Sequence, residues 1–166
     1  MKNTDMFADL STTQAGQLFI ETIYPWEVLP LIQTFVRALG PKLSPEEYNH
    51  PGEEVWIHKS AVLYPNIYIA GPTIIGAGTE VRPGAFIRGS ALVGRGCVVG
   101  NSTELKNCIL FDKVQVPHYN YVGDSILGNY SHMGAGSICS IVKGDKKVVV
   151  VRHEGTGHET GRRKCG

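Results

Sequence analysis

The chain has 166 residues, of which 42% are hydrophobic and 19% are charged, and its formal net charge is +1. That length suits one domain with a sizeable core and is too short for two large ones. The near-neutral balance gives no electrostatic case for a nucleic-acid or membrane partner, and the apolar run Val148–Val151 is far too short to span a bilayer. Glycine is the outlier, at 20 residues against roughly 7% on average. The excess indicates many tight corners.

Residues 1–50 have the pattern of helices. Ser11–Gln14 fits a capping box before a short helix. Over Pro25–Leu39 the apolar residues recur at helical spacing, and Gly40 follows as a C-cap. Pro30 is expected to kink or split this helix. The stripe predicts a helix docked on the main domain, with a tether to a partner subunit as the alternative.

From Trp56 onward the period changes to six residues. Every sixth residue from Ile57 is large and apolar, ten times in succession: Ile57, Leu63, Ile69, Ile75, Val81, Ile87, Val93, Val99, Leu105 and Phe111. The residue four later in each hexad is mostly small, as at Ala61, Thr79 and Ala91. Repeats of this length indicate a solenoid in which each unit stacks on its neighbours.

A six-residue unit can form one short strand and then turn a corner. Three units would close a triangle, so that three hexads make one coil and successive coils stack at about 4.8 Å. The large aliphatic residue would point into the prism, and the small residue would lie where the corner narrows. The sequence therefore predicts an all-β fold, a single-stranded parallel β-helix preceded by a helical segment.

The hexad pattern breaks at Pro117, where another aliphatic residue is expected. It resumes at Tyr121, Leu127 and Met133, so the pattern predicts a four-residue insertion, Pro117–Asn120, that leaves the solenoid as a loop. Loops on a rigid scaffold frequently carry function.

Three zones are expected along the chain: a helical segment (1–50), a β-helix domain (51–152) and a polar C-terminal tail (153–166), the last interpreted as a possible truncated solenoid. A basic loop at 143–147 and a strand at Val148–Val151 should precede the tail.

The four cysteines, Cys97, Cys108, Cys139 and Cys165, form no CxxC pair, and no signal peptide is apparent at the start of the chain. We expect reduced thiols in a cytoplasmic protein, with Cys97 packed as a small apolar residue.

Three segments carry a family resemblance: Val99–Lys106, His118–Asp124 and Met133–Ser137. They resemble the acetyltransferase half of the bifunctional enzymes that make UDP-N-acetylglucosamine. The resemblance is ungapped from Arg88 to Lys147 and extends back to Ile57 as bare repeat. It implies a left-handed β-helix, an exception to the right-handed crossover rule. It also implies acetyl transfer from acetyl-CoA to glucosamine-1-phosphate. Residues 1–50 lack the nucleotide loop of the other enzymatic half.

The resemblance also implies roles for individual residues. The general base falls on His118, and this assignment suits the chemistry, because a sugar ammonium must lose its proton before it attacks a thioester. The phosphate-binding cations fall on Arg88 and Lys106, whose spacing is one full predicted coil, so that they should lie one above the other. Arg82 is the alternative to Arg88 as the phosphate-binding cation. The alternative for His118 is a structural role, as a loop histidine that is hydrogen-bonded to the backbone.

Further matches are implied for substrate and cofactor. Tyr121 matches a substrate-contacting tyrosine, Lys147 (or Lys146) a lysine that reaches the phosphate from a neighbouring subunit, and Ala135 the start of the acetyl-CoA groove. Two sugar-binding asparagines of the bacterial enzymes are replaced here by His132, retained as a substrate-binding candidate, and by Ile141, which cannot form a side-chain hydrogen bond.

The favoured function is thus a homotrimeric N-acetyltransferase that acts on an amino-sugar phosphate and needs no metal. Three alternatives stay open. The chain could be a sugar-phosphate-binding module that lost transfer, because the family has several more coils, or a structural scaffold. A zinc hydratase with three histidines is disfavoured, since His118 and His132 are much farther apart in the chain than the closely spaced histidine pair of that family.

Overall fold

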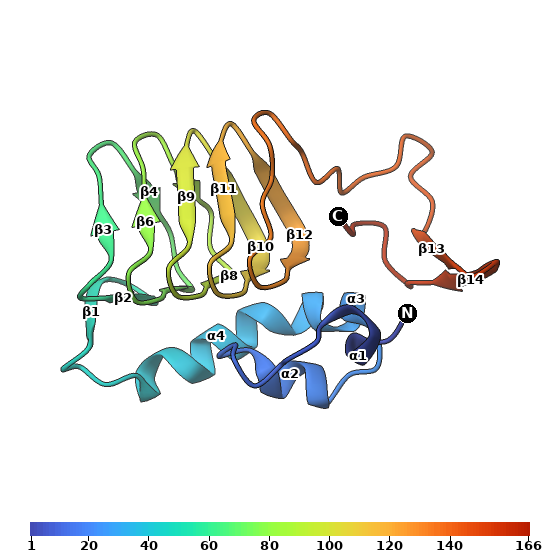
Figure 1. The fold of residues 1–166 in the computed structure, drawn as a ribbon, viewed down its shortest axis with the longest axis horizontal. Helices are drawn as coiled ribbons and strands as arrows, with labels where there is room; N and C mark the ends of the chain where they lie inside the picture. Colours follow the sequence, from blue (N-terminus) through green and yellow to red (C-terminus); the bar gives the residue numbers. More distant parts are fainter.

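The computed structural model describes all residues, 1–166. It contains a left-handed parallel β-helix with a layer of short helices along one side and a small hairpin at the C-terminal end (Figure 1). The helical segments are α1 (Asn3–Met6), α2 (Gly16–Ile20), α3 (Pro25–Val28), η1 (Leu29–Leu31), α4 (Ile32–Leu39) and η2 (Gly40–Lys42). No helix is long and apolar enough to cross a bilayer.

The β-helix is a prism with three walls. Wall 1 contains β2 (Val55–His58), β5 (Thr73–Ile75), β8 (Ala91–Val93) and the second parts of β10 (Glu104–Leu110) and β12 (Tyr121–Leu127). Wall 2 contains β3 (Val62–Leu63), β6 (Glu80–Val81), β9 (Val98–Asn101) and β11 (Gln115–His118). Wall 3 contains β4 (Tyr68–Ile69), β7 (Phe86–Ile87) and the first parts of β10 and β12. The antiparallel strand β1 (Tyr48–Gly52) borders β2.

The early coils have the predicted length of three hexads. Ile57 pairs with Ile75, and Ile75 pairs with Val93, as a coil of that length requires. These side chains are buried in a single core that runs along the prism. Neighbouring coils therefore bury one another's apolar face, as expected for a solenoid.

The later coils are shorter by a single residue, which corrects the predicted frame. Val93 pairs with Leu110, so Leu110 enters the prism core and Phe111 does not. The missing residue is at the corner between walls 3 and 1. The earlier coil turns there through Gly89 and Ser90, whereas the next coil turns through Asn107 alone, with φ 49°. Asparagine tolerates this left-handed conformation better than most residues.

The predicted four-residue insertion is consequently wrong. Pro117–Asn120 does not leave the solenoid, because β11 continues in register with β9 and pairs His118 with Asn101. The shorter coil also places Val122 rather than Tyr121 in the core, and Tyr121 faces outward on wall 3. The predicted core positions Leu127 and Met133 do pack against the core.

The helical segment covers wall 1 and forms a second core with it. The outward side chains of wall 1 are apolar: Trp56, Ile74, Leu92, Ile109 and Ile126. Phe111 joins them, with its ring centroid 5.0 Å from that of Phe7 and 5.4 Å from that of Phe19. Pro30 lies in η1, between α3 and α4, so the predicted kink is present as one turn of 3₁₀ helix.

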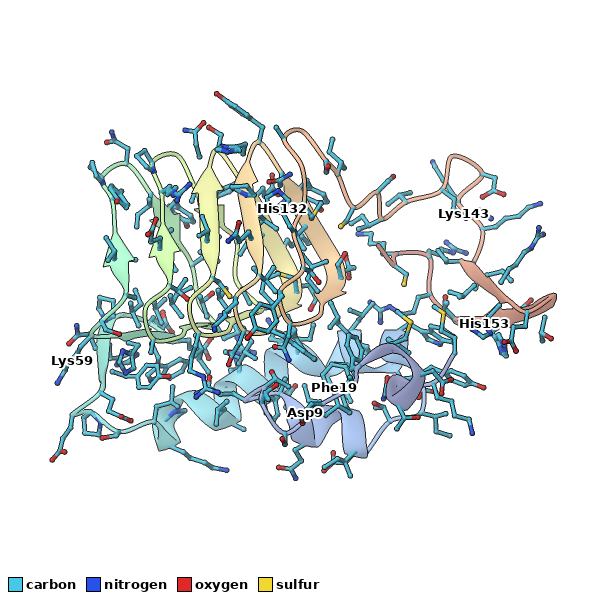
Figure 2. The ribbon with its side chains drawn as sticks, in the orientation of Figure 1. Asp9, Phe19, Lys59, His132, Lys143 and His153 are labelled. Atoms are coloured by element: carbon cyan, nitrogen blue, oxygen red, sulfur yellow. The ribbon has the colours of Figure 1, made fainter.

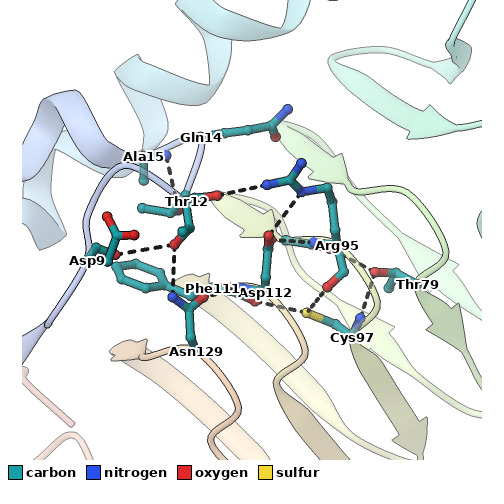
Figure 3. Close-up of polar contacts among 12 residues, drawn as sticks. Asp9, Thr12, Gln14, Ala15, Thr79, Arg95, Cys97, Phe111, Asp112 and Asn129 are labelled. Carbon is teal, nitrogen blue, oxygen red and sulfur yellow. Dashed lines mark hydrogen bonds and ion pairs between the residues drawn. The ribbon is translucent and has the colours of Figure 1, made fainter.

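Polar contacts fix the loop before α2 to the prism (Figure 3). The Arg95 guanidinium donates to the carbonyl oxygen of Thr12 (3.1 Å) and to Asp112 (3.0 Å). The Asn129 amide donates to the Thr12 hydroxyl (2.9 Å) and accepts from the backbone N–H of Asp112. The helical layer is therefore anchored to the prism by both apolar burial and directed bonds.

The C-terminal region forms a hairpin of β13 (Val150–His153) and β14 (Thr156–Glu159), where the sequence suggested a strand at 148–151 and a polar tail. The chain then returns to the last coil. Lys164 bridges antiparallel to Val142, and the N–H of Gly166 donates to the carbonyl of Asp124 (3.0 Å). The final residues thus lie against the corner between walls 3 and 1.

Two cysteines lie deep in the prism, and this leads to a test of its interior. Burial raises the pKa of Cys97 to about 11 and that of Cys108 to about 12, from an ordinary 9.0. Because each pKa unit lowers the thiolate fraction about tenfold at pH 8, both should resist alkylation in the folded protein, whereas the half-buried Cys139 should react first. Peptide mapping by mass spectrometry after iodoacetamide treatment measures this order. Cys108 reacting as fast as Cys139 would contradict the packed interior.

Candidate active site

His118, the last residue of β11, lies at the corner between walls 2 and 3. Its imidazole is exposed, and the residue is held through its backbone. The His118 N–H donates to the side-chain oxygen of Asn120 (3.0 Å), and its carbonyl accepts from the N–H of Gly136 (3.0 Å). Tyr119 then turns the corner with φ 51°. The ring is therefore presented to solvent from a defined corner of the scaffold rather than from a loose loop.

Asn120 organises this corner and was not singled out from the sequence. Its side chain is only 2% exposed, and its amide donates to the carbonyls of Gly134 (2.8 Å) and Ser137 (3.2 Å) in the next coil. These bonds connect the coil that carries His118 to the coil that carries Ala135. The signal available in the sequence was that Asn120 occupies the small corner position that Thr103 occupies in the preceding coil.

Ala135 lies directly above His118 in the stack. Gln115 pairs with His132, and Tyr121 pairs with Ile138, in the same parallel register. Because His118 and Ala135 follow Gln115 and His132 at equal distances along the chain, that register aligns them. The predicted base and the predicted start of the acetyl-CoA groove are therefore on adjacent rungs of one corner.

Wall 3 carries the predicted cations. Arg88 and Lys106 follow the paired residues Ile87 and Leu105, so the two side chains come from adjacent coils, as their spacing predicts. The Arg88 guanidinium is 2.7 Å from Glu104, and this hydrogen bond raises its pKa. The pair is solvent-exposed and adds little stability.

Lys106 is less tightly paired than Arg88. Its ammonium nitrogen is 4.0 Å from Oδ2 of Asp124, beyond hydrogen-bond distance, and its side chain is partly exposed. It can therefore still donate to an anionic ligand.

Tyr121 lies on wall 3 beside Glu104, with which it pairs in register. Partial burial raises the pKa of its hydroxyl, and the Glu104 carboxylate adds to the effect. The ring lies over Gly123, where a Cβ would collide with it. Tyr121, Arg88 and Lys106 thus share one wall, and His118 is at its edge.

The remaining candidates lie elsewhere. Arg82 follows β6 on wall 2 and pairs with Glu80 at 3.0 Å, which places the rival of Arg88 on a different wall from Lys106. His132 is also on wall 2 (Figure 2), and its ring nitrogen is 3.2 Å from the side-chain oxygen of Gln115. Lys147 lies in the exposed loop beyond the last coil. The same loop contains Lys143, which is labelled in Figure 2.

Ile141, one of the two departures from the family pattern, has a structural role. Its carbonyl accepts from the N–H of Cys165 (3.2 Å), and its side chain lies beside Gly166. The position that would hold a sugar-binding asparagine is occupied here by contacts to the C-terminal residues.

The wall 3 candidates line none of the larger cavities. A polar groove of about 610 Å³ lies away from wall 3, between the helical segment and the prism, and includes Thr13, Lys42, His58 and Arg95. No group of three His, Cys, Asp or Glu side chains could hold a metal ion. Wall 3 is thus an open face that a ligand would meet from solvent or against another surface.

The repeat region of the chain is similar to a known protein family and to named relatives. The model of the GMPPB C-terminal domain matches residues 69–153. A bifunctional protein GlmU from Methanococcus maripaludis (strain C5) is 36% identical over 134 residues, 80% of this chain and 33% of its own length. Another GlmU, from Nostoc sp. (strain PCC 7120), is 38% identical over 101 residues, 61% of this chain and 21% of its own. The family resemblance inferred from the sequence is thereby confirmed.

The chain spans a third or less of the length of these two curated relatives. Among solved structures, the acetyltransferase domain of PglB from Neisseria gonorrhoeae FA1090 aligns with a TM-score of 0.41 at 18% identity, over 51% of this chain and 48% of that one.

Proposed function

Because the chain belongs to the GMPPB C-terminal domain family and its repeats are related to proteins named GlmU, we propose that it is an N-acetyltransferase. It takes the acetyl group from acetyl-CoA and transfers it to the amine of an amino-sugar phosphate, in a cytoplasmic pathway to nucleotide sugars. The observation that carries this proposal is His118, whose exposed imidazole is held at a rigid corner beside Ala135, at the edge of the wall that carries Arg88 and Lys106.

In this reaction His118 acts as the general base. An imidazole changes charge between about pH 5 and 8, which suits removal of a proton from the acceptor amine as it attacks. The nitrogen forms a bond to the acetyl carbonyl carbon, the carbon–sulfur bond of the thioester breaks, and the proton passes from the imidazolium to the departing thiolate. The products are the N-acetylated sugar phosphate and free coenzyme A.

The cations of wall 3 hold the other end of the acceptor. Lys106 and Arg88 supply charge-assisted donors for the phosphate, and Tyr121 supplies a hydroxyl beside them. Gly123, which pairs with Lys106, follows His118 in the chain after the corner residues Tyr119 and Asn120. The acceptor would lie across wall 3, with its phosphate at the cations and its amine toward His118.

A homotrimer is part of the proposal. The helical segment covers wall 1, so walls 2 and 3, and the corner between them that carries His118, remain free to face another copy. A second prism against wall 3 would enclose the candidate site, and the exposed Lys147 loop of that copy could supply a further cation. Sedimentation equilibrium of the full chain measures the oligomeric state.

The alternative is a module that binds a sugar phosphate, or serves as a scaffold, without transfer. The open wall 3 favours it, because none of the larger cavities in a single chain shields His118 from water. The two proposals differ in whether acetyl-CoA is consumed.

The deciding experiment is mass spectrometry of a panel of amino-sugar phosphates incubated with the protein and acetyl-CoA. A gain of one acetyl group on any acceptor, with release of coenzyme A, supports the transferase and identifies the substrate. Binding of a sugar phosphate without any product would leave the non-catalytic module as the function.

Lys106→Ala is expected to raise KM for the phosphorylated acceptor about tenfold, since loss of one charge-assisted bond costs about 1.5 kcal/mol. The value of kcat should change less than KM, because the phosphate takes no part in the bonds formed and broken in acetyl transfer. Steady-state kinetics measures both constants, with Lys59→Ala as the control because Lys59 is an exposed residue of the first coil (Figure 2). An unchanged KM would identify Lys106 as an ordinary surface lysine.

A further inference from the structure

A buried carboxylate lies at the corner where wall 3 meets wall 1. The side chain of Asp124 is 6% exposed. Its Oδ1 accepts from the Asn107 amide (2.8 Å) and from the Arg162 guanidinium (3.3 Å). Its Oδ2 accepts no hydrogen bond, and the Lys106 ammonium is 4.0 Å from it. One carboxylate is therefore shared unequally between two cations.

The side-chain charges around Asp124 do not cancel. Lys106 and Arg162 carry two positive charges against the single negative charge of Asp124, while Arg88 and Glu104 form their own ion pair on wall 3. Asp124 thus faces two cations with a single negative charge, and the exposed fractions of the Lys106 and Arg162 side chains are 31% and 24%. An anion that reaches this partly desolvated corner would find an incompletely paired ammonium group.

Arg162 is held in place by the C-terminal residues themselves. Its N–H donates to the hydroxyl of the buried Thr160 (3.1 Å), and its Nε donates to the carbonyl of Lys164 (3.2 Å). The N–H of Gly166 donates to the carbonyl of Asp124 (3.0 Å). The guanidinium therefore approaches Asp124 from a segment fixed on both sides of it.

We infer that Arg162 is a positioning residue for the phosphate site: by occupying Oδ1 of Asp124 it leaves the Lys106 ammonium free to bind a phosphate group. Without Arg162, the Lys106 ammonium is the remaining cation beside a buried carboxylate, and burial strengthens its attraction to that carboxylate. Lys106 would then be drawn into a closer pair with Asp124 and would be lost to the ligand. This inference relies on the proposed function for the identity of the site, but its test does not depend on acetyl transfer.

A purely structural role makes a different prediction. If Arg162 only anchored the C-terminal segment, removal of Asp124 would add to the damage caused by removal of Arg162. If Arg162 acts by competing with Lys106 for the carboxylate, removal of the carboxylate should restore the phosphate affinity lost in Arg162→Gln. The reason is that no buried carboxylate then pairs with Lys106. The double variant therefore separates the two roles.

The experiment titrates inorganic phosphate into the full chain without acetyl-CoA and follows amide shifts by NMR. Arg162→Gln is expected to weaken phosphate binding about tenfold, equivalent to about 1.4 kcal/mol. The double variant Arg162→Gln, Asp124→Asn should bind within about threefold of the wild type. Arg163→Gln, at the exposed neighbouring residue, is the matched control. Circular dichroism verifies that each variant is folded.

Unchanged binding by Arg162→Gln, a double variant as weak as the single one, or a wild-type protein that does not bind phosphate would each overturn the inference. Failure of the transferase proposal would give a different result. The wild type would still bind phosphate and the double variant would still regain that binding, but no acceptor would gain an acetyl group. If acetyl transfer is observed and Arg162→Gln leaves the phosphate affinity unchanged, only the role of Arg162 is overturned.

Discussion

Replacement of His118 by alanine is expected to lower kcat for acetyl transfer by about 10²- to 10⁴-fold, the usual contribution of a positioned general base. The fold should be unaffected, because the His118 ring is exposed and the corner is held by backbone groups and by Asn120. Binding of the sugar phosphate should change little, since the cations of wall 3 remain. Measurement of kcat and KM with the acceptor identified by the product screen tests this directly.

The matched control is His153→Ala, at the end of β13 in the C-terminal hairpin (Figure 2). It removes an imidazole that lies away from the His118 corner and should keep wild-type turnover. Added imidazole should restore part of the activity of His118→Ala. In a control reaction without the acceptor, added imidazole should yield no acetylated sugar. Turnover by His118→Ala equal to that of the wild type would show that the base is another group.

Phe111→Ala is expected to lower the free energy of unfolding by about 3–5 kcal/mol, the usual cost of emptying a buried aromatic position. Phe111 is 1% exposed, and its ring packs against Phe7 and Phe19 of the helical segment. Because the ring points away from the prism, the cavity should loosen the helices rather than the coils. Urea unfolding measures the loss, and hydrogen exchange locates it.

Protection should fall in α2 and persist in β9 and β11. Phe86→Ala is the matched control, since the Phe86 ring is 41% exposed on wall 3 and its loss should cost no more than about 1 kcal/mol. Loss of protection centred on the coils instead of on the helices would contradict the outward orientation of Phe111.

The solenoid itself was determined by the sequence. Large apolar residues at every sixth position, from Ile57 to Leu105, can be buried together only if each hexad turns a corner, and this local rule needs no knowledge of distant contacts. Leu63, in the end coil, is the exception and is 42% exposed. The helical stripe around Trp26 and Val36, the break at Pro30 and the stacking of Arg88 above Lys106 follow from the same periodicities.

The tertiary structure alone decided which residues face inward after Leu105. Leu110 and Phe111 are adjacent and both apolar, so either could continue the hexad, and the choice depends on pairing with Val93 in the preceding coil. The wall that the helices cover, the burial of Asn120 and the approach of Arg162 to Asp124 also depend on contacts between residues far apart in the chain. Periodicity records the local environment of a residue, whereas register and docking are set by hydrogen bonds and burial that the local pattern does not contain.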